Sequence, residues 1–138
     1  MDRAKRYLLT GASSGIGAQL AHELAGKGYD LALAARRTDS LQALTSELQS
    51  RHGCKVVVLA LDVTDYAACA DVVGLAANAL GGLDGIIANA GIALAGKAGG
   101  GHFERIRQTL ETNLLGAIAC LEAAAVLFRQ QGLSLIHI

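Results

Sequence analysis

The segment LLTGASSGIGAQLA, at residues 8–21, joins an apolar run to a helical pattern through a turn rich in glycine and serine. Glycine adopts backbone conformations that other residues avoid, and it lets a second chain or a ligand come close. When such a turn follows a strand and opens a helix, its N–H groups and the positive end of the helix dipole converge on one point. The segment therefore predicts a strand-turn-helix unit that binds an anion, and a pyrophosphate in particular.

Each residue of the turn has a predicted role. Gly11 permits the tight turn, Gly15 lets the backbone approach a pyrophosphate, and Gly17 lets the helix and the strand pack closely. Ser13 and Ser14 offer hydroxyl groups to the ligand. The alternative is an ordinary glycine turn in which Ser14 caps the helix.

The rest of the chain alternates between apolar runs and helical patterns. Four runs without polar alternation predict buried parallel strands, at 6–10, 29–35, 55–61 and 83–89. Helical patterns separate these runs. The first begins at Ile16, the second follows the cap candidates Thr38 and Asp39, and the third covers 65–80 with a cap at Thr64 or Asp65. Right-handed βαβ units of this kind predict an α/β fold, a doubly wound parallel sheet of the Rossmann type, in one domain over 1–132.

The last predicted helix, from Phe103 to Phe128, carries an apolar stripe too broad for one partner. We expect one flank to lie on the sheet and the other to pack on a second subunit or on another part of the same protein. The glycine-rich stretch 91–101 precedes this helix. It is equally interpreted as a flexible connection and as part of a ligand site at the carboxyl end of a strand.

Composition excludes several classes of protein. The 12 basic and 12 acidic side chains balance, which disfavours a nucleic-acid partner, and 52% of the residues are hydrophobic. Glycines and serines interrupt the first apolar run before a signal peptide could form, and no uninterrupted apolar run is long enough for a membrane span. Cys54, Cys69 and Cys120 lack metal-ligand or disulfide spacing. We therefore expect a soluble, cytoplasmic protein with buried free thiols and no metal site.

Three more segments follow the glycine turn in chain order: LDVTD at 61–65, NAG at 89–91 and TNLLG at 112–116. With the T-G-x-x-x-G-x-G spacing that begins at Thr10, they resemble the short-chain dehydrogenase/reductase family over about residues 6–132. The resemblance implies an oxidoreductase that moves hydride between a nicotinamide cofactor and a small alcohol or carbonyl substrate. The runner-up is a non-catalytic NADP-binding module.

By this resemblance, Asp62 and Val63 contact the adenine, and Asn89 fixes the end of the fourth strand beside the cofactor. Ala88 departs from the family, which usually has a second asparagine there. Without the resemblance, Asp62 and Asn89 are also ordinary turn or cap residues. The predicted cofactor-binding residues are Gly11, Ser13, Ser14, Gly15, Ile16, Gly17, Arg36, Arg37, Asp62, Val63, Asn89, Ala90 and Gly91.

The end of the second strand predicts which nicotinamide cofactor is used. Sites for NAD usually place a carboxylate there, to accept hydrogen bonds from the ribose 2′-hydroxyl. Here the strand ends at Ala35 and is followed by Arg36 and Arg37. An acid would repel a 2′-phosphate and guanidinium groups attract it, so we expect NADP(H), with Arg36 as the main contact and Arg37 as a second contact or a solvated neighbour. Two arginines on an exposed loop are the alternative for either residue alone.

The catalytic residues are largely missing from the sequence. By the resemblance, Asn113 supports a proton-relay water; otherwise it is a polar residue that bonds to a carbonyl near its helix. The family's catalytic tyrosine needs a lysine four residues later to lower its pKa from about 10. No tyrosine here begins a Y-x-x-x-K. We therefore expect the serine, tyrosine and lysine to lie beyond residue 138, and this stretch to bind the cofactor without turnover.

The final residues 133–138, LSLIHI, have two interpretations. They suit the opening of a fifth strand, and they also translate CTGTCTCTTATACACATC, an adaptor used in DNA library preparation. The second interpretation predicts a foreign tail after Gly132 and a sheet truncated after its fourth or fifth strand. For the intact protein the resemblance implies a homo-oligomer, because the long helix resembles one that packs in a four-helix dimer interface.

Overall fold

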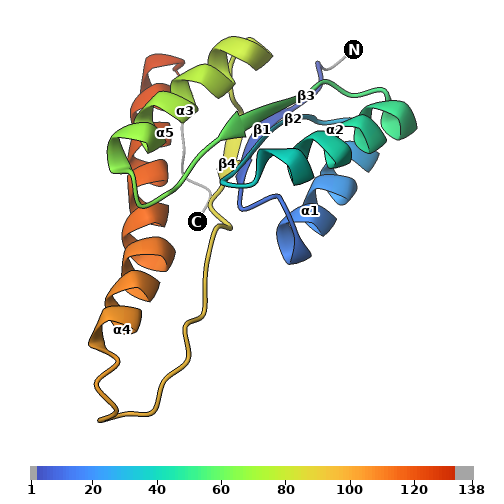
Figure 1. Ribbon diagram of the computed structural model, residues 1–138. Helices are drawn as coiled ribbons and strands as arrows, with labels where there is room; N and C mark the ends of the chain where they lie inside the picture. Colours follow the sequence, from blue (N-terminus) through green and yellow to red (C-terminus); the bar gives the residue numbers. More distant parts are fainter. Residues whose placement is uncertain (1–2, 133–138) are drawn as a thin grey trace.

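The computed structural model describes residues 3–132, so both interpretations of 133–138 lie outside the described residues. Strands and helices alternate along the chain until the fourth strand, after which the chain is helical (Figure 1). In order, the elements are β1 (Arg6–Thr10), α1 (Gly15–Gly26), β2 (Asp30–Ala35), α2 (Thr38–His52), β3 (Val56–Ala60), α3 (Tyr66–Leu80), β4 (Gly85–Ile87), α4 (Phe103–Leu110), the π-helical segment η1 (Glu111–Gly116) and α5 (Ala117–Gln130).

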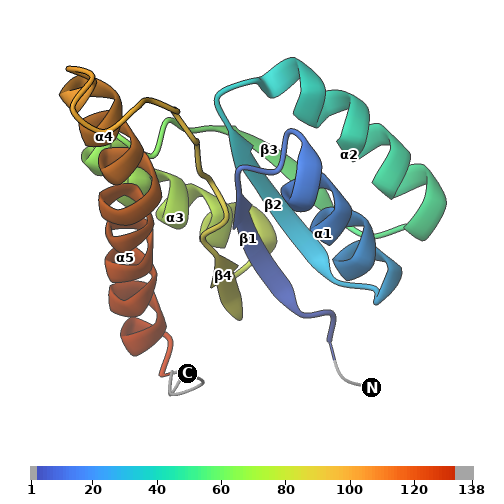
Figure 2. The same cartoon turned by 90° about the horizontal axis from the view of Figure 1, so that it is seen from below.

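The sheet is parallel throughout, with strand order β3-β2-β1-β4. Helices α1 and α2 cover one face, and α3 and α5 cover the other (Figure 2). Leu8 and Leu9 on β1 are both fully buried because each faces one of these helical layers. The doubly wound α/β fold predicted from the sequence is thereby confirmed. The strand order reverses beside β1, and open α/β sheets bind ligands at such a point.

Two predicted helix caps differ in outcome. Asp65 caps α3, because its carboxylate accepts a hydrogen bond from the Ala68 amide at 3.1 Å. In contrast, α2 begins at Thr38 itself with Arg37 as its N-cap residue, and its cap makes no side-chain hydrogen bond. The prediction of Thr38 or Asp39 as the cap is therefore wrong by one or two positions. The fourth strand is also shorter than the predicted 83–89, because pairing with β1 stops at Ile87.

The single long helix predicted over 103–128 is a helix in three parts, since η1 separates α4 from α5. Helix α5 buries Cys120, Ala124 and Phe128 against α3 and the sheet, whereas α4 buries none of its residues. Its Phe103 is 73% exposed. Most of the apolar stripe therefore has no partner among residues 3–132, as the sequence led us to expect.

No uninterrupted apolar run of the sequence is long enough for a membrane span, but the helix Phe103–Gln130 as a whole differs in this respect. Its 28 residues are long and apolar enough, by length and composition alone, to cross a membrane. Only 17% of its apolar window is buried inside the chain, and a single helix of this kind is weak evidence for a membrane span. The three cysteines are free and buried, as predicted.

Candidate functional site

The glycine turn between β1 and α1 has the geometry that its spacing predicted. Gly11 and Gly15 have φ of +68° and +58°, in the left-handed region that favours glycine. A Cβ on Gly17 would lie 2.2 Å from the carbonyl oxygen of Gly11, so only glycine lets α1 come this close to the strand end. A Cβ on Gly15 would meet nothing within 4 Å. The backbone at Gly15 is thus open to a ligand, whereas the space beside Gly17 is filled by the Gly11 carbonyl.

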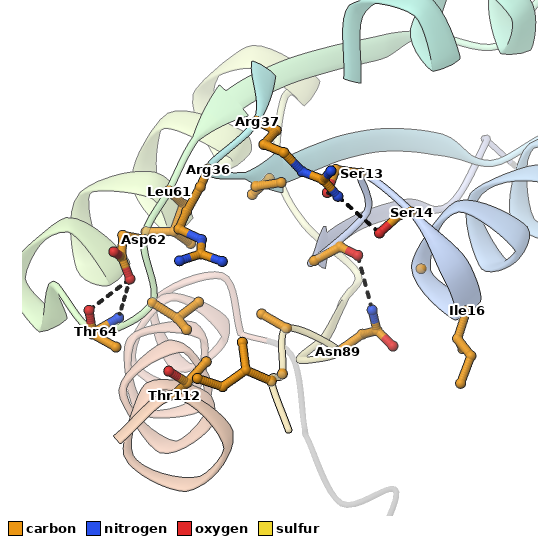
Figure 3. A pocket seen from close by; sticks show the side chains of 18 of the residues that line it. Ser13, Ser14, Ile16, Arg36, Arg37, Leu61, Asp62, Thr64, Asn89 and Thr112 are labelled. Carbon is orange, nitrogen blue, oxygen red and sulfur yellow. Dashed lines mark hydrogen bonds between the residues drawn. The ribbon is translucent and has the colours of Figure 1, made fainter. Parts of the chain in front are cut away.

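Ser14 precedes α1 in extended conformation, yet its hydroxyl makes no capping hydrogen bond. Instead, Nη2 of Arg37 donates to Oγ of Ser13 at 3.4 Å and to Oγ of Ser14 at 3.2 Å (Figure 3). The guanidinium from the β2–α2 connection therefore lies against the glycine turn, with both serine hydroxyls accepting from it. Ser14 is therefore the N-cap residue of α1 by position, as the alternative interpretation had it, but its side chain does not cap the helix.

Thr10 and Asn89 join the ends of β1 and β4. The Thr10 hydroxyl is buried and accepts hydrogen bonds from the backbone amides of Asn89 and Ala90, each at 3.1 Å. In return, Nδ2 of Asn89 donates to the carbonyls of Thr10 and Gly11, each at 3.2 Å. These bonds continue the strand pairing beyond Ile87 and hold the NAG segment against the glycine turn. The expectation that Asn89 fixes this strand end agrees with the hydrogen bonds.

A cleft of about 530 Å³ opens along the carboxyl ends of the strands. Its walls come from the glycine turn, the ends of β2, β3 and β4, and the helix after the glycine-rich loop (Figure 3). Twelve of the thirteen predicted cofactor residues line it, Gly15 being the one that does not. The sequence did not single out Ile92, Gln108, Glu111 and Thr112, which line it as well. Only Thr112 lay within a recognised motif.

Asp62 and Arg36 follow the neighbouring strands β3 and β2 and lie near one another at one end of the cleft (Figure 3). The Asp62 carboxylate accepts from Oγ1 of Thr64 at 2.7 Å and from the Thr64 amide at 3.0 Å. These two hydrogen bonds, with a smaller contribution from the Arg36 charge, lower the pKa of Asp62. The carboxylate is therefore ionised at neutral pH and can accept hydrogen bonds from a ligand.

Asn113 does not line the cleft. It lies in η1, where its Oδ1 accepts from the Ile92 amide at 2.7 Å and its Nδ2 donates to the Ile92 carbonyl at 2.8 Å. The side chain is thus bonded to the backbone just after the NAG segment. The alternative of a helical polar residue that bonds to a carbonyl matches this geometry, although the partner is 21 residues away in sequence.

None of the chain's tyrosines lines the cleft. Tyr7 and Tyr29 stack on one another with their centroids 5.5 Å apart, and Tyr66 begins α3. Among residues 3–132, no group of three or more His, Cys, Asp or Glu side chains is placed to hold a metal ion. The cleft therefore offers hydrogen-bond donors, guanidinium groups and the carboxylates of Asp62 and Glu111, without a candidate proton-transferring tyrosine in the described part of the chain.

Comparisons with known proteins agree with this site. The sequence profile described as short chain dehydrogenase matches residues 5–137. An uncharacterized oxidoreductase of Mycobacterium tuberculosis is 42% identical over 129 residues, which are 93% of this chain and 51% of that protein. Another, from Myxococcus xanthus, is 41% identical over 116 residues, which are 84% of this chain and 46% of that protein. The chain therefore spans about half the length of these curated relatives.

A solved structure shares the fold as well. An alcohol dehydrogenase from the archaeon Thermococcus sibiricus, complexed with 5-hydroxy-NADP, superposes with a TM-score of 0.89 at 32% identity. The match covers 95% of this chain and 56% of the other.

Proposed function

The chain belongs to the short-chain dehydrogenase/reductase family, and from this premise we propose that it is the cofactor-binding part of an NADP(H)-dependent oxidoreductase. The bound nicotinamide would supply or accept the hydride, and the substrate would be a small alcohol or carbonyl compound. The observation that carries the choice of cofactor is the pair of arginines at the adenosine end of the cleft, where β2 ends at Ala35 without a carboxylate.

Different residues of the cleft would bind different parts of the cofactor. The amides at the start of α1, around Gly15, would hold the diphosphate, since Gly15 is exposed and a Cβ there would meet nothing within 4 Å. The Gly11 amide is already bonded to the carbonyl of Ala34 at 2.8 Å, so Gly11 shapes the turn instead. Asp62 would accept a hydrogen bond from the adenine, because Thr64 occupies only one of its oxygens. Arg36 and Arg37 would flank the 2′-phosphate, and charge-assisted hydrogen bonds of this kind contribute about 1.5–3 kcal/mol each.

The hydrogen bonds of Arg37 support a second contact with the cofactor over a role as a solvated neighbour. Its Nη2 is already held by the hydroxyls of Ser13 and Ser14, which restricts the side chain before any ligand binds. Less side-chain entropy is then lost on binding, so part of the cost of ordering the site is met in advance. The NADP analogue in the Thermococcus sibiricus structure is consistent with this choice.

Asn113 would act through Ile92 and the segment after β4, whose backbone it bonds from both sides. The acid/base tyrosine and its lysine belong to the part of the family's sequence that this chain does not match. We therefore expect the 138-residue chain to bind nucleotide without turnover. A non-catalytic NADP-binding module is the second candidate, since residues 3–132 contribute no tyrosine or lysine to the cleft lining.

For the complete protein we propose a cytoplasmic homo-oligomer. The exposed apolar residues of α4 and α5, among them Phe103, Ile106 and Leu121, support this assembly. Large exposed apolar patches mark interaction surfaces, and the family resemblance implies that this helix packs in a dimer.

The test is a calorimetric titration of NADPH and NADH against the chain and against Arg36→Ala. We expect NADPH to bind more tightly, and Arg36→Ala to weaken NADPH binding by roughly 10–100-fold with little change for NADH. Arg129→Ala, on an exposed site of α5, is the matched loss of charge and should change neither affinity. Equal affinities of the unmodified chain for the two cofactors would refute the assignment.

A further inference from the structure

The π-helical segment η1 interrupts the long helix where it passes the cleft. A π-helical turn has one residue more than an α-helical turn. Such turns are rare overall, but those that occur are often found at functional sites. Glu111 and Thr112 of this segment line the cleft, while Asn113 bonds to the backbone of Ile92. The last residue of the segment, Gly116, belongs to the TNLLG motif but has no part in the site described above.

Gly116 is buried against Val63, which follows β3 and lies beside Asp62. A Cβ on Gly116 would lie 2.7 Å from Cγ2 and 2.9 Å from both Cβ and the carbonyl oxygen of Val63. Contacts of this kind are shorter than real Cβ atoms make. The helix thus approaches the segment after β3 as closely as glycine allows.

Val63 cannot retreat from such a contact without moving other parts of the protein. It is 6% exposed and packs in the core beneath α3 and α5. Its carbonyl oxygen accepts a hydrogen bond from the buried Cys69 thiol of α3 at 3.5 Å. A group added at Gly116 would therefore shift the segment that carries Asp62 and Thr64, because the core behind Val63 is closely packed.

From this contact we propose that Gly116 is a positioning residue for the adenine end of the cleft. Through Val63, it sets the place of the Asp62 carboxylate relative to Arg36, which follows the neighbouring strand β2. The same π-helical segment holds the other wall through Asn113 and Ile92. The inference rests on the proposed function, since it assigns this end of the cleft to the adenosine half of NADP(H).

The experiment compares Gly116→Ala with Gly74→Ala in the 138-residue chain. Gly74 is also helical, in α3, but a Cβ there would meet nothing within 4 Å, so it is the matched control. Each variant is titrated calorimetrically with adenosine 2′,5′-bisphosphate. Amide NMR spectra of the free proteins are recorded beside the titrations.

We expect Gly116→Ala to raise the Kd for the bisphosphate about tenfold at unchanged stoichiometry, because the displaced Asp62 carboxylate would no longer meet the adenine. The amide signals of Val63 and Thr64 should shift in its spectrum. Gly74→Ala should leave the Kd and these signals unchanged. A merely structural role would lower the number of sites per chain and leave the Kd as it was, and that result would overturn the proposal.

An unchanged Kd at full stoichiometry, or unmoved Val63 and Thr64 signals, would also overturn it. If the unmodified chain binds no nucleotide, the proposed function fails, and the spectra of the free variants still decide whether Gly116 positions Val63.

The test also covers a failure of Gly116→Ala to fold. The double variant with Val63→Ala removes Cγ2, the nearest of the three contacts, and leaves those to Cβ and the carbonyl oxygen at 2.9 Å, so it should recover part of the stability that the single variant loses. If the loss in the double variant equals the sum of the losses in the two single variants, the contact with Val63 is not the cause.

Discussion

Replacement of Thr10 by valine tests whether the bond between β1 and β4 holds the site together. Valine has nearly the same shape, so the change removes the hydroxyl and little else. Thr10 is 1% exposed, and its oxygen accepts from the amides of Asn89 and Ala90, both at 3.1 Å. Thr10→Val leaves these two N–H groups without an acceptor at a place where water has little access.

The expected cost follows from those two groups. A buried donor without a partner costs about 1–3 kcal/mol. Asn89 and Ala90 are half-buried, so each should cost an amount near the lower limit, and we expect a total loss of about 2–3 kcal/mol in the free energy of unfolding. Thr10→Ser is the matched control, because it keeps the oxygen and loses one methyl group, at about 1 kcal/mol.

The assay is urea denaturation of the three proteins, followed by circular dichroism, with NADPH titration of each folded protein. Thr10→Val should unfold at lower urea than Thr10→Ser, and it should bind NADPH more weakly because the NAG segment is no longer held against the glycine turn. If the valine variant is as stable as the serine variant, the two amides do not depend on this hydroxyl and the reasoning is refuted.

Three further predictions concern glycine, charge and thiol groups. Gly17→Ala should unfold the chain or destabilise it far more than Gly15→Ala, because its Cβ meets the Gly11 carbonyl whereas that of Gly15 meets nothing; equal losses in urea would contradict this. Arg3 and Arg6 hold the pKa of Asp84 below its usual value, so its contribution to stability is complete above about pH 4 and is lost as the pH falls. Asp84→Asn should therefore lose less stability on acidification than the unmodified chain, and parallel pH profiles of the two would exclude the ion pairs as the cause. Burial raises the pKa of Cys120 to about 12, so a thiol reagent at pH 8 should modify it only in denaturant, and rapid reaction of the native chain would show that it is accessible.

Much of the fold could be predicted because its signals are local. Buried parallel strands show continuous apolar runs, and helices show apolar residues at steps of three and four, so each element is visible within its own segment. The glycine turn could also be predicted, because the backbone at Gly11 requires a positive φ, which glycine adopts readily. The two arginines after β2 were found for the same reason, since their charges stand next to a strand end.

The sequence by itself therefore determined the order of strands and helices along the chain, the turn that opens α1, and the residue types that line the cleft. Only the tertiary structure decided that Thr10 bonds to Asn89, which is 79 residues away, and that Arg37 lies on Ser13 and Ser14. It alone placed a π-helical turn at 111–116, where Asn113 reaches Ile92 while Gly116 packs on Val63. Propensity and periodicity report what a segment prefers on its own, whereas these contacts depend on how closely distant segments approach once the core is packed.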